Sequence, residues 1–254
     1  MTELAEHNRQ HFDKVATTHQ NDFGELIDAA IRELKARRGW ITPALNDASP
    51  SSEAEARREL RLLDYACGAG TVSKALAPYA TQTIGLDLSS GMIAEYNKAA
   101  SELGFSTEKM HAYQYNLLTT DTETDSTTTV PLPENTLAPF DVIVIGMALH
   151  HVSEPNVLLA RFRELLKPRG VCVVMDMVPT DDAPDIEGVL EPSQLEVVKT
   201  IGKRGFTEQE MRELYEGAGM GKGFDYVVIE EKFRFTMFGH QFGVTGFMAR
   251  GEVE

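Results

Sequence analysis

The feature that most constrains this chain is a glycine-containing turn that follows a short apolar stretch. Residues 62–71 read Leu-Leu-Asp-Tyr-Ala-Cys-Gly-Ala-Gly-Thr, and Asp87 comes seventeen residues after Gly70. Glycines at the end of a strand let the backbone approach a ligand closely, and an acidic residue at the end of the next strand accepts hydrogen bonds from ribose hydroxyls. The two segments together predict an α/β site for a nucleoside-bearing cofactor.

The details of the turn argue against a dinucleotide. Such a site normally carries a third glycine, whereas the run here is Gly68-Ala-Gly-Thr-Val-Ser73. Asp64, four residues before Gly68, also brings negative charge to the place where a pyrophosphate would lie. A sulfonium cofactor with an amino acid moiety has no phosphate, and Asp64 attracts its ammonium group directly or through water.

The rest of the chain predicts alternating strands and helices, preceded by N-terminal helices and followed by a C-terminal hairpin. Strands are expected at 61–65, 83–87, 110–113, 141–145 and 171–178, and helices at 4–18, 21–39, 71–77, 92–103, 155–167 and 207–217. A turn is expected at 167–170, and two last strands, near 224–235 and 240–250, predict an antiparallel hairpin. The expected fold is α/β, namely a Rossmann-like, doubly wound, mostly parallel seven-stranded sheet with an antiparallel C-terminal hairpin and an N-terminal helical cap.

Composition limits the class of partner. The net charge of −15 disfavours a nucleic acid partner, since such a surface repels phosphate backbones. The longest apolar run, at 142–149, is too short to span a bilayer, and the first residues do not resemble a signal peptide. Cys67 and Cys172 are the two cysteines and show no zinc-binding spacing. These features predict a cytoplasmic protein, with access to the nucleus left open, no membrane partner and no metal.

Residues 60–180 resemble the class I S-adenosylmethionine-dependent methyltransferases. Within that class they are most similar to the small-molecule group related to the ubiquinone and menaquinone-biosynthesis methyltransferases. The resemblance rests on three segments: Asp64-Tyr-Ala-Cys-Gly-Ala-Gly70, Phe140-Asp-Val-Ile-Val-Ile-Gly-Met-Ala-Leu-His-His-Val152 and Leu165-Leu-Lys-Pro-Arg-Gly170. The family usually has glycine where this chain has Ala66 and Arg169.

The resemblance implies S-adenosyl-L-methionine as cofactor and S-adenosyl-L-homocysteine as product. Asp87 then corresponds to the acidic ribose ligand, Met92 to a residue that covers one face of the adenine, and Asn116 to a polar contact at the adenine edge. The implied cofactor-binding residues are Asp64, Ala66, Gly68, Gly70, Asp87, Leu88, Met92, Asn116, Leu117 and Met147.

The acceptor side is less defined. His150 and His151 follow the fourth strand, where the cleft of such a sheet opens, and either imidazole is a candidate general base. A structural role in the loop is the competing interpretation. By resemblance, His11 and Phe12 belong to a segment that caps the cofactor site, and residues 179–206 lie where these enzymes often place substrate-recognition elements.

These features predict a single methyltransferase domain over residues 1–254. Within it, 1–45 form a helical lid, 60–180 the cofactor-binding core, and 181–254 a substrate-side insert with the terminal hairpin. Residues 46–59 are expected to form an exposed connection and 119–138 a loop.

The predicted function is methyl transfer to an O, N, S or C nucleophile of a small-molecule acceptor by in-line displacement. The alternatives are a non-catalytic or protein-directed methyltransferase-fold subunit of a regulatory complex and, from another class, a nicotinamide-dependent oxidoreductase. The sequence does not identify the acceptor, the number of methyl transfers or the oligomeric state.

Overall fold

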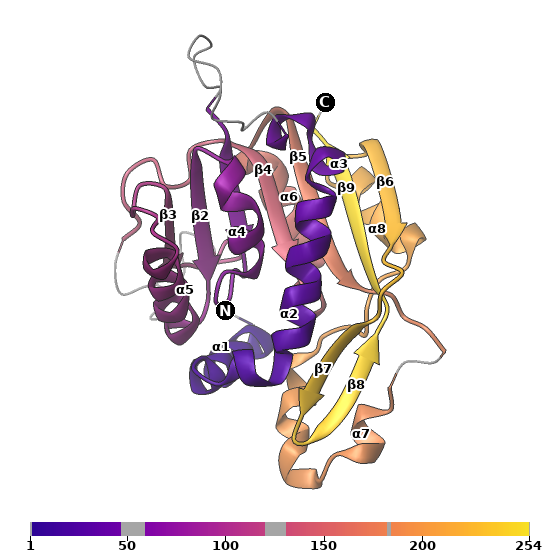
Figure 1. Cartoon of the computed structure of the whole chain (residues 1–254). Coiled ribbons are helices and arrows are strands. Elements are labelled where there is room, and N and C mark those ends of the chain that lie inside the picture. Colours follow the sequence, from indigo (N-terminus) through magenta and orange to yellow (C-terminus); the bar gives the residue numbers. More distant parts are fainter. Residues whose placement is uncertain (1, 47–58, 120–130, 182–183, 254) are drawn as a thin grey trace.

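The computed structural model describes residues 2–46, 59–119, 131–181 and 184–253 (Figure 1). Most of the connection expected at 46–59 and the centre of the loop expected at 119–138 lie outside the described residues. In the part of the chain that is described, no helix has the length and apolar character needed to cross a membrane. The same residues hold no group of three or more His, Cys, Asp or Glu side chains that would bind a metal ion.

The predicted seven-stranded, mostly parallel sheet is confirmed, with the strand order β3-β2-β1-β4-β5-β9-β6. Strands β3, β2, β1, β4 and β5 run parallel, and β9 is antiparallel to both β5 and β6. The strands are β1 Arg61–Tyr65, β2 Gln82–Asp87, β3 Met110–Gln114, β4 Phe140–Gly146, β5 Leu166–Met177, β6 Lys222–Val228 and β9 Gly246–Glu252.

Helices cover both faces of the sheet because its strands are apolar on both sides. Leu62 of β1 packs with α2 and α4, while the next residue, Leu63, packs with α6 and α8 on the opposite face (Figure 1). The helices are α1 Glu3–Val15, α2 His19–Ala36, α3 Arg38–Ile41, α4 Thr71–Leu76, α5 Ser90–Glu102, α6 Pro155–Leu165, α7 Ile186–Val189 and α8 Glu208–Gly217. Short 3₁₀ helices are η1 Pro43–Leu45, η2 Ala77–Tyr79, η3 Leu149–His151 and η4 Pro192–Thr200.

Local sequence signals set the helix ends. The Ser89 hydroxyl accepts a hydrogen bond from the Met92 amide at the start of α5. Thr207 and Glu210 form the reciprocal capping box expected at the start of α8. Pro155 takes the first position of α6, where a proline removes no helical hydrogen bond.

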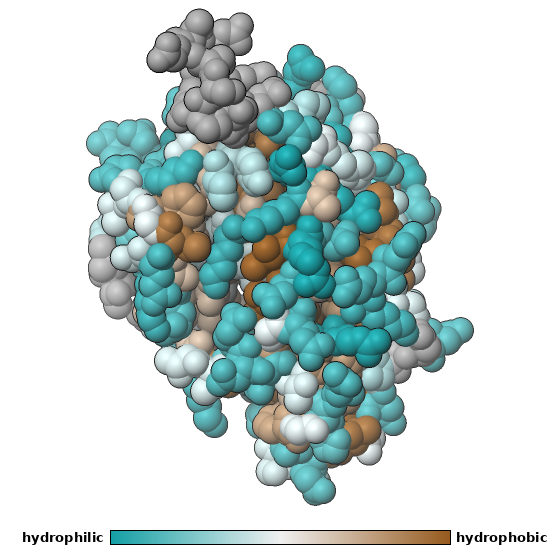
Figure 2. All heavy atoms as spheres, in the orientation of Figure 1, coloured by the Kyte–Doolittle hydropathy of each residue, from teal (hydrophilic) through white to brown (hydrophobic). Residues whose placement is uncertain are grey.

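The C-terminal hairpin differs from its prediction. Each expected strand is divided in two, so that β6 and β9 join the main sheet while β7 Phe233–Met237 and β8 His240–Val244 form a separate two-stranded sheet. The division falls at residues 230–232, which read Glu-Glu-Lys and are exposed. Charged side chains in succession do not fit a sheet that is covered on both faces. The small sheet packs instead against α2, through rings such as Phe235 on Phe23. The face drawn in Figure 2 is mostly hydrophilic, with hydrophobic patches along α2 and at the lower end, where the small sheet lies.

The predicted boundary between the turn at 167–170 and the fifth strand is wrong. β5 begins at Leu166, which pairs with Phe140, and the register shifts before Val171 pairs with Val142. The irregularity is local, because Arg169 has a φ of 64°, a left-handed conformation that a regular strand does not contain.

Close packing between β4 and α4 gives a test of this arrangement. A Cβ atom on Gly146 would lie 2.7 Å from Cγ2 of Val72. Gly146→Ala is expected to lower the free energy of unfolding by about 1–3 kcal/mol through overpacking, and the double variant Gly146→Ala/Val72→Ala is expected to recover part of the loss. Urea denaturation measures both effects. Gly217→Ala is the control, because nothing lies within 4 Å of its added Cβ; equal stability of all variants would contradict the packing argument.

Candidate cofactor and acceptor site

A cavity lies at the carboxyl ends of the central parallel strands and is covered by the N-terminal helices. Its floor comes from the loops after β1 and β2, at residues 64–69 and 87–89, and its side from residues 146–148 after β4. α1 and α2 close it with Phe12, His19 and Leu26 among others. This is the position at which a doubly wound sheet binds its ligands.

The loop after β1 brings bare backbone to the cavity. Gly68 has a φ of 49°, and a Cβ built there would meet nothing within 4 Å, so the space beside it is open. Gly70, with a φ of 88°, is needed for packing, because its Cβ would lie 3.1 Å from the ring of Tyr96. Ala66 also has a positive φ of 52°, which costs a residue with a side chain some strain.

Asp87 joins the two loops of the cavity floor. One carboxylate oxygen accepts a hydrogen bond from the Gly68 amide at 2.8 Å, and the other accepts one from the Ser89 amide at 2.9 Å. Each oxygen can accept at least one further hydrogen bond. Burial raises the pKa of Asp87, and the amides of Ser89 and Gly68 oppose that rise. The carboxylate is therefore held in place and still able to receive hydroxyl donors.

Asp64 lies deeper, with 1% of its surface exposed. One of its oxygens accepts hydrogen bonds from the amide of Ser73 at 3.0 Å and from the hydroxyl of Ser73 at 2.7 Å. The Tyr96 hydroxyl donates to the Ser73 hydroxyl in turn. These partners are neutral, and burial raises the pKa of Asp64 to about 8. A cation entering the cavity would favour the ionised form.

Most of the predicted cofactor residues come together in the cavity wall. These are Asp64, Ala66, Gly68, Asp87, Leu88, Met92, Asn116 and Met147. Gly70 and Leu117 do not line it: Gly70 packs behind the loop and Leu117 belongs to the core between the sheet and α6. The side-chain oxygen of Asn116 accepts a hydrogen bond from the Leu118 amide at 2.9 Å, which leaves its NH₂ group available to a ligand.

Of the four predicted acceptor-side residues, two line the cavity and two do not. Phe12 and His151 line the cavity, with ring centroids 5.3 Å apart and ring planes at 83°. His11 and His150 lie outside the wall. The His150 ring is buried against β5, where its Nδ1 is 2.8 Å from a carboxylate oxygen of Asp176.

Sequence reasoning missed Asn8, Arg9 and His19 as cavity residues. Asn8 precedes Phe12 by four residues, so the helical spacing of α1 already placed both on one face. Its amide nitrogen donates to the His151 carbonyl at 3.0 Å, and its amide oxygen is buried with no hydrogen-bond partner in the described part of the chain. No sequence signal marks His19, whose imidazole is neutral because burial lowers its pKa to about 4.

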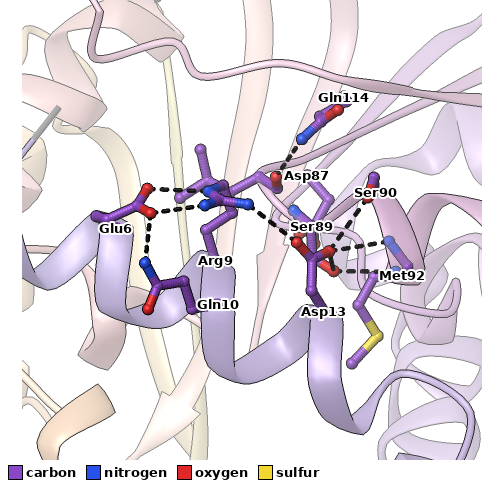
Figure 3. Close-up of polar contacts among 11 residues, drawn as sticks. Glu6, Arg9, Gln10, Asp13, Asp87, Ser89, Ser90, Met92 and Gln114 are labelled. Carbon is purple, nitrogen blue, oxygen red and sulfur yellow. Dashed lines mark hydrogen bonds and ion pairs between the residues drawn. The ribbon is translucent and has the colours of Figure 1, made fainter. Parts of the chain in front are cut away.

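α1 is attached to the cofactor floor at the start of α5. Figure 3 shows the Asp13 carboxylate beside Ser89 and Ser90, directly after Asp87. One Asp13 oxygen accepts from the Ser89 hydroxyl at 2.7 Å and from the Gly91 amide at 3.0 Å. Its other oxygen accepts from Arg9 at 3.1 Å. A carboxylate at the amino end of a helix is stabilised by the helix dipole, so this contact holds α1 against the start of α5, beside the cavity.

Comparisons with known proteins agree with this geometry. Residues 63–172 match the family model of a methyltransferase domain. An uncharacterized methyltransferase of Schizosaccharomyces pombe is 30% identical over 161 residues, which cover 63% of this chain and 53% of that protein. A ubiquinone biosynthesis O-methyltransferase of Psychrobacter cryohalolentis is 29% identical over 174 residues, covering 64% of this chain and 60% of that protein. The matches thus span between half and two thirds of these relatives.

The fold is also similar to that of solved methyltransferase structures. The crystal structure of magnesium protoporphyrin IX methyltransferase from Synechocystis PCC 6803 with bound S-adenosylmethionine has a TM-score of 0.58, covering 100% of this chain and 99% of that chain at 13% identity. The protein has a methyltransferase Rossmann-like fold. Residues 63–172 thus match a methyltransferase domain, and the chain is similar in sequence to the ubiquinone-biosynthesis O-methyltransferases.

The raised pKa of Asp64 predicts how stability depends on pH. The folded protein holds the Asp64 proton up to about pH 8, whereas the unfolded chain releases it near 3.8. Between these values the folded state binds more protons, so this group makes stability fall as the pH rises. Asp64→Asn, without ligand, is expected to gain stability relative to wild type from pH 5 to pH 8. Urea denaturation at both pH values tests this; a constant difference between the two proteins would contradict it.

The hydrogen bonds of Asp13 predict how strongly the amides of α1 are protected from hydrogen exchange. Asp13→Ala removes four hydrogen bonds to a carboxylate, and a hydrogen bond to a charged group contributes about 1.5–3 kcal/mol in favourable cases. Amide hydrogen exchange in α1 is expected to accelerate by about tenfold or more, while exchange in β4 stays unchanged. Lys14→Ala, at an exposed position of the same helix, is the control. Unchanged protection of α1 in Asp13→Ala would show that the contact does not hold the lid.

Proposed function

We propose that the protein uses S-adenosyl-L-methionine to methylate a small-molecule acceptor at O, N, S or C. The observation that carries this proposal is the pairing of the open Gly68 backbone with the fixed Asp87 carboxylate, 2.8 Å apart at the ends of adjacent strands. The match of residues 63–172 to the family model of a methyltransferase domain supports it. The product of the cofactor is then S-adenosyl-L-homocysteine.

The described residues fit this cofactor. Asp87 has acceptor positions for two ribose hydroxyls, and Gly68 allows close approach of the backbone. Asp64 and the unpartnered amide oxygen of Asn8 favour a cationic ammonium group. Asn116 offers its NH₂ group to the adenine edge. Leu88, Met92, Ala66 and Met147 supply cavity wall, while Gly70 and Leu117 act through packing.

When bound, the cofactor supplies a methyl group made electrophilic by its sulfonium charge. The protein then has to align the nucleophile with that methyl group and exclude water. The lid provides the exclusion, because α1 and α2 cover the cavity with apolar side chains such as Phe12, Leu26 and Ile27. A covered cavity of this kind suits a small molecule better than a protein chain, and it is why we favour catalysis on a small molecule over a regulatory or protein-directed role.

Two further features bear on the cellular compartment and on the choice of cofactor. Cys67 and Cys172 are both unpaired and buried, which suits a reducing compartment, and we propose the cytoplasm. Ser73, whose amide and hydroxyl donate to Asp64, stands where a dinucleotide site carries its third glycine, which argues against the nicotinamide-dependent alternative.

Loss of the Asp87 carboxylate tests the cofactor assignment. Asp87→Ala is expected to weaken S-adenosylhomocysteine binding by at least about tenfold, because two hydroxyls lose a charged acceptor. Asp87→Asn, which keeps one acceptor oxygen, is expected to fall between wild type and Asp87→Ala. Isothermal titration calorimetry measures the affinities, and Glu102→Ala at the exposed end of α5 is the control. An affinity of Asp87→Ala equal to that of wild type would overturn the ribose assignment.

A further inference from the structure

The hydrogen bonding of His151 fixes the chemistry of its ring. Nδ1 lies 2.7 Å from the carbonyl oxygen of Thr200, at the end of η4. A carbonyl oxygen only accepts hydrogen bonds, so the proton must be on Nδ1. In the neutral ring Nε2 then carries a free lone pair. Within the described ranges no hydrogen-bond partner occupies Nε2, and the ring lines the cavity.

Resting on the methyl-transfer function proposed above, we propose that His151 is the general base of this enzyme and that it accepts the proton of a hydroxyl-bearing acceptor on Nε2. His150 and Asp176 are positioning residues for that base. The acceptor is then an alcohol or phenol that enters the cavity with its proton, rather than a thiolate or free amine, which attack without such help.

The surroundings keep His151 neutral. Burial lowers the pKa of His151 well below its ordinary value, and His150, His11 and His19 add to that effect, while the hydrogen bond to Thr200 opposes it. These groups face the ring from η3, α1, α2 and η4. The other neighbours, the Phe12 ring and the Asn8 amide, are uncharged. A neutral imidazole at pH 7 is the form that takes up a proton.

His150 packs against this ring and is not itself part of the cavity wall. The two ring centroids are 4.0 Å apart, and their planes are inclined by 41°. His150 is in turn fixed by Asp176, which accepts from the His150 amide at 3.1 Å and lies 2.8 Å from its Nδ1. The Asp176 carboxylate is fully buried, so the arrangement is rigid. This division of roles explains why adjacent histidines follow β4.

The proposed step is balanced without another reactant. A bond forms between the acceptor oxygen and the methyl carbon, and the bond from that carbon to sulfur breaks with its electron pair going to sulfur. The hydroxyl proton moves to Nε2 of His151, which becomes an imidazolium hydrogen-bonded through Nδ1 to Thr200. Solvent takes up that proton after the lid opens.

Nuclear magnetic resonance on protein with ¹⁵N-labelled histidine tests the base directly and needs no acceptor. Long-range ¹H–¹⁵N spectra distinguish the two neutral tautomers and the imidazolium, and the resonances absent from His151→Phe identify His151. The expected result at pH 7 is the neutral ring with its proton on Nδ1. A proton on Nε2, or an imidazolium at pH 7, would overturn the proposal.

A pair of acceptor probes tests the proton transfer. Phenol keeps its proton at neutral pH, whereas thiophenol is largely ionised, so the base matters for one and not for the other. His151→Phe and His151→Gln are expected to lose about 100-fold or more in methyl transfer to phenol and to stay within about threefold of wild type for thiophenol. Asp176→Asn is expected to lower the rate of methyl transfer to phenol by about tenfold, without a matching loss for thiophenol. It is also expected to shift the pH profile of the reaction with phenol.

The outcomes separate this proposal from the methyltransferase function itself. S-Adenosylhomocysteine titration shows whether each variant is folded and binds cofactor, and His240→Phe, on the exposed hairpin, is the matched control. Equal losses for both probes, or none, would overturn the base assignment while leaving methyl transfer intact. Absence of S-adenosylhomocysteine binding in wild type would instead refute the proposed function. If the wild-type protein methylates neither phenol nor thiophenol, the nuclear magnetic resonance measurement of the His151 tautomer decides whether the base assignment stands.

Discussion

The Asp87 carboxylate is the contact on which the rest of the site depends. By accepting from Gly68 and from Ser89, it joins the loop after β1 to the start of α5. Ser89 in turn donates to Asp13 of the lid. The half-buried Asp87 carboxylate thus positions the glycine loop and the start of α5, and through Ser89 it is connected to α1. These backbone amides reduce the cost of taking its charge out of water.

A second buried acid gives the cavity its charge preference. Asp64 and Asp87 lie at the ends of neighbouring strands, and burial raises the pKa of Asp64, with a smaller contribution from the charge of Asp87. Without ligand, Asp64 stays protonated up to about pH 8, and a cationic ligand favours its ionised form. The site therefore favours positive charge, and a shifted pKa of this kind is a common property of functional sites.

The sequence was a good guide wherever local rules and the sheet determine structure. The strands, the capped helices and the loops around Gly68 and Asp87 follow from apolar runs, capping residues and turns. It was a poor guide where distant segments meet. Nothing local indicates that Asn8 reaches the His151 carbonyl or that η4 places Thr200 beside the His151 ring. The split hairpin was missed because β6 and β7 form one extended pattern, interrupted only by three charged residues.

The two histidines show why chemistry is harder to predict than fold. They are adjacent in sequence, yet within η3 one ring is held against β5 and the other lines the cavity. Their roles depend on partners from two later segments, Asp176 in the sheet and Thr200 in η4. The floor of the cavity is built on the loops after β1 and β2, whereas the His151 ring is oriented by Thr200 of η4, a segment outside the main sheet. Under the proposed function, changes in η4 would alter the acceptor side of the cavity while its floor stays the same.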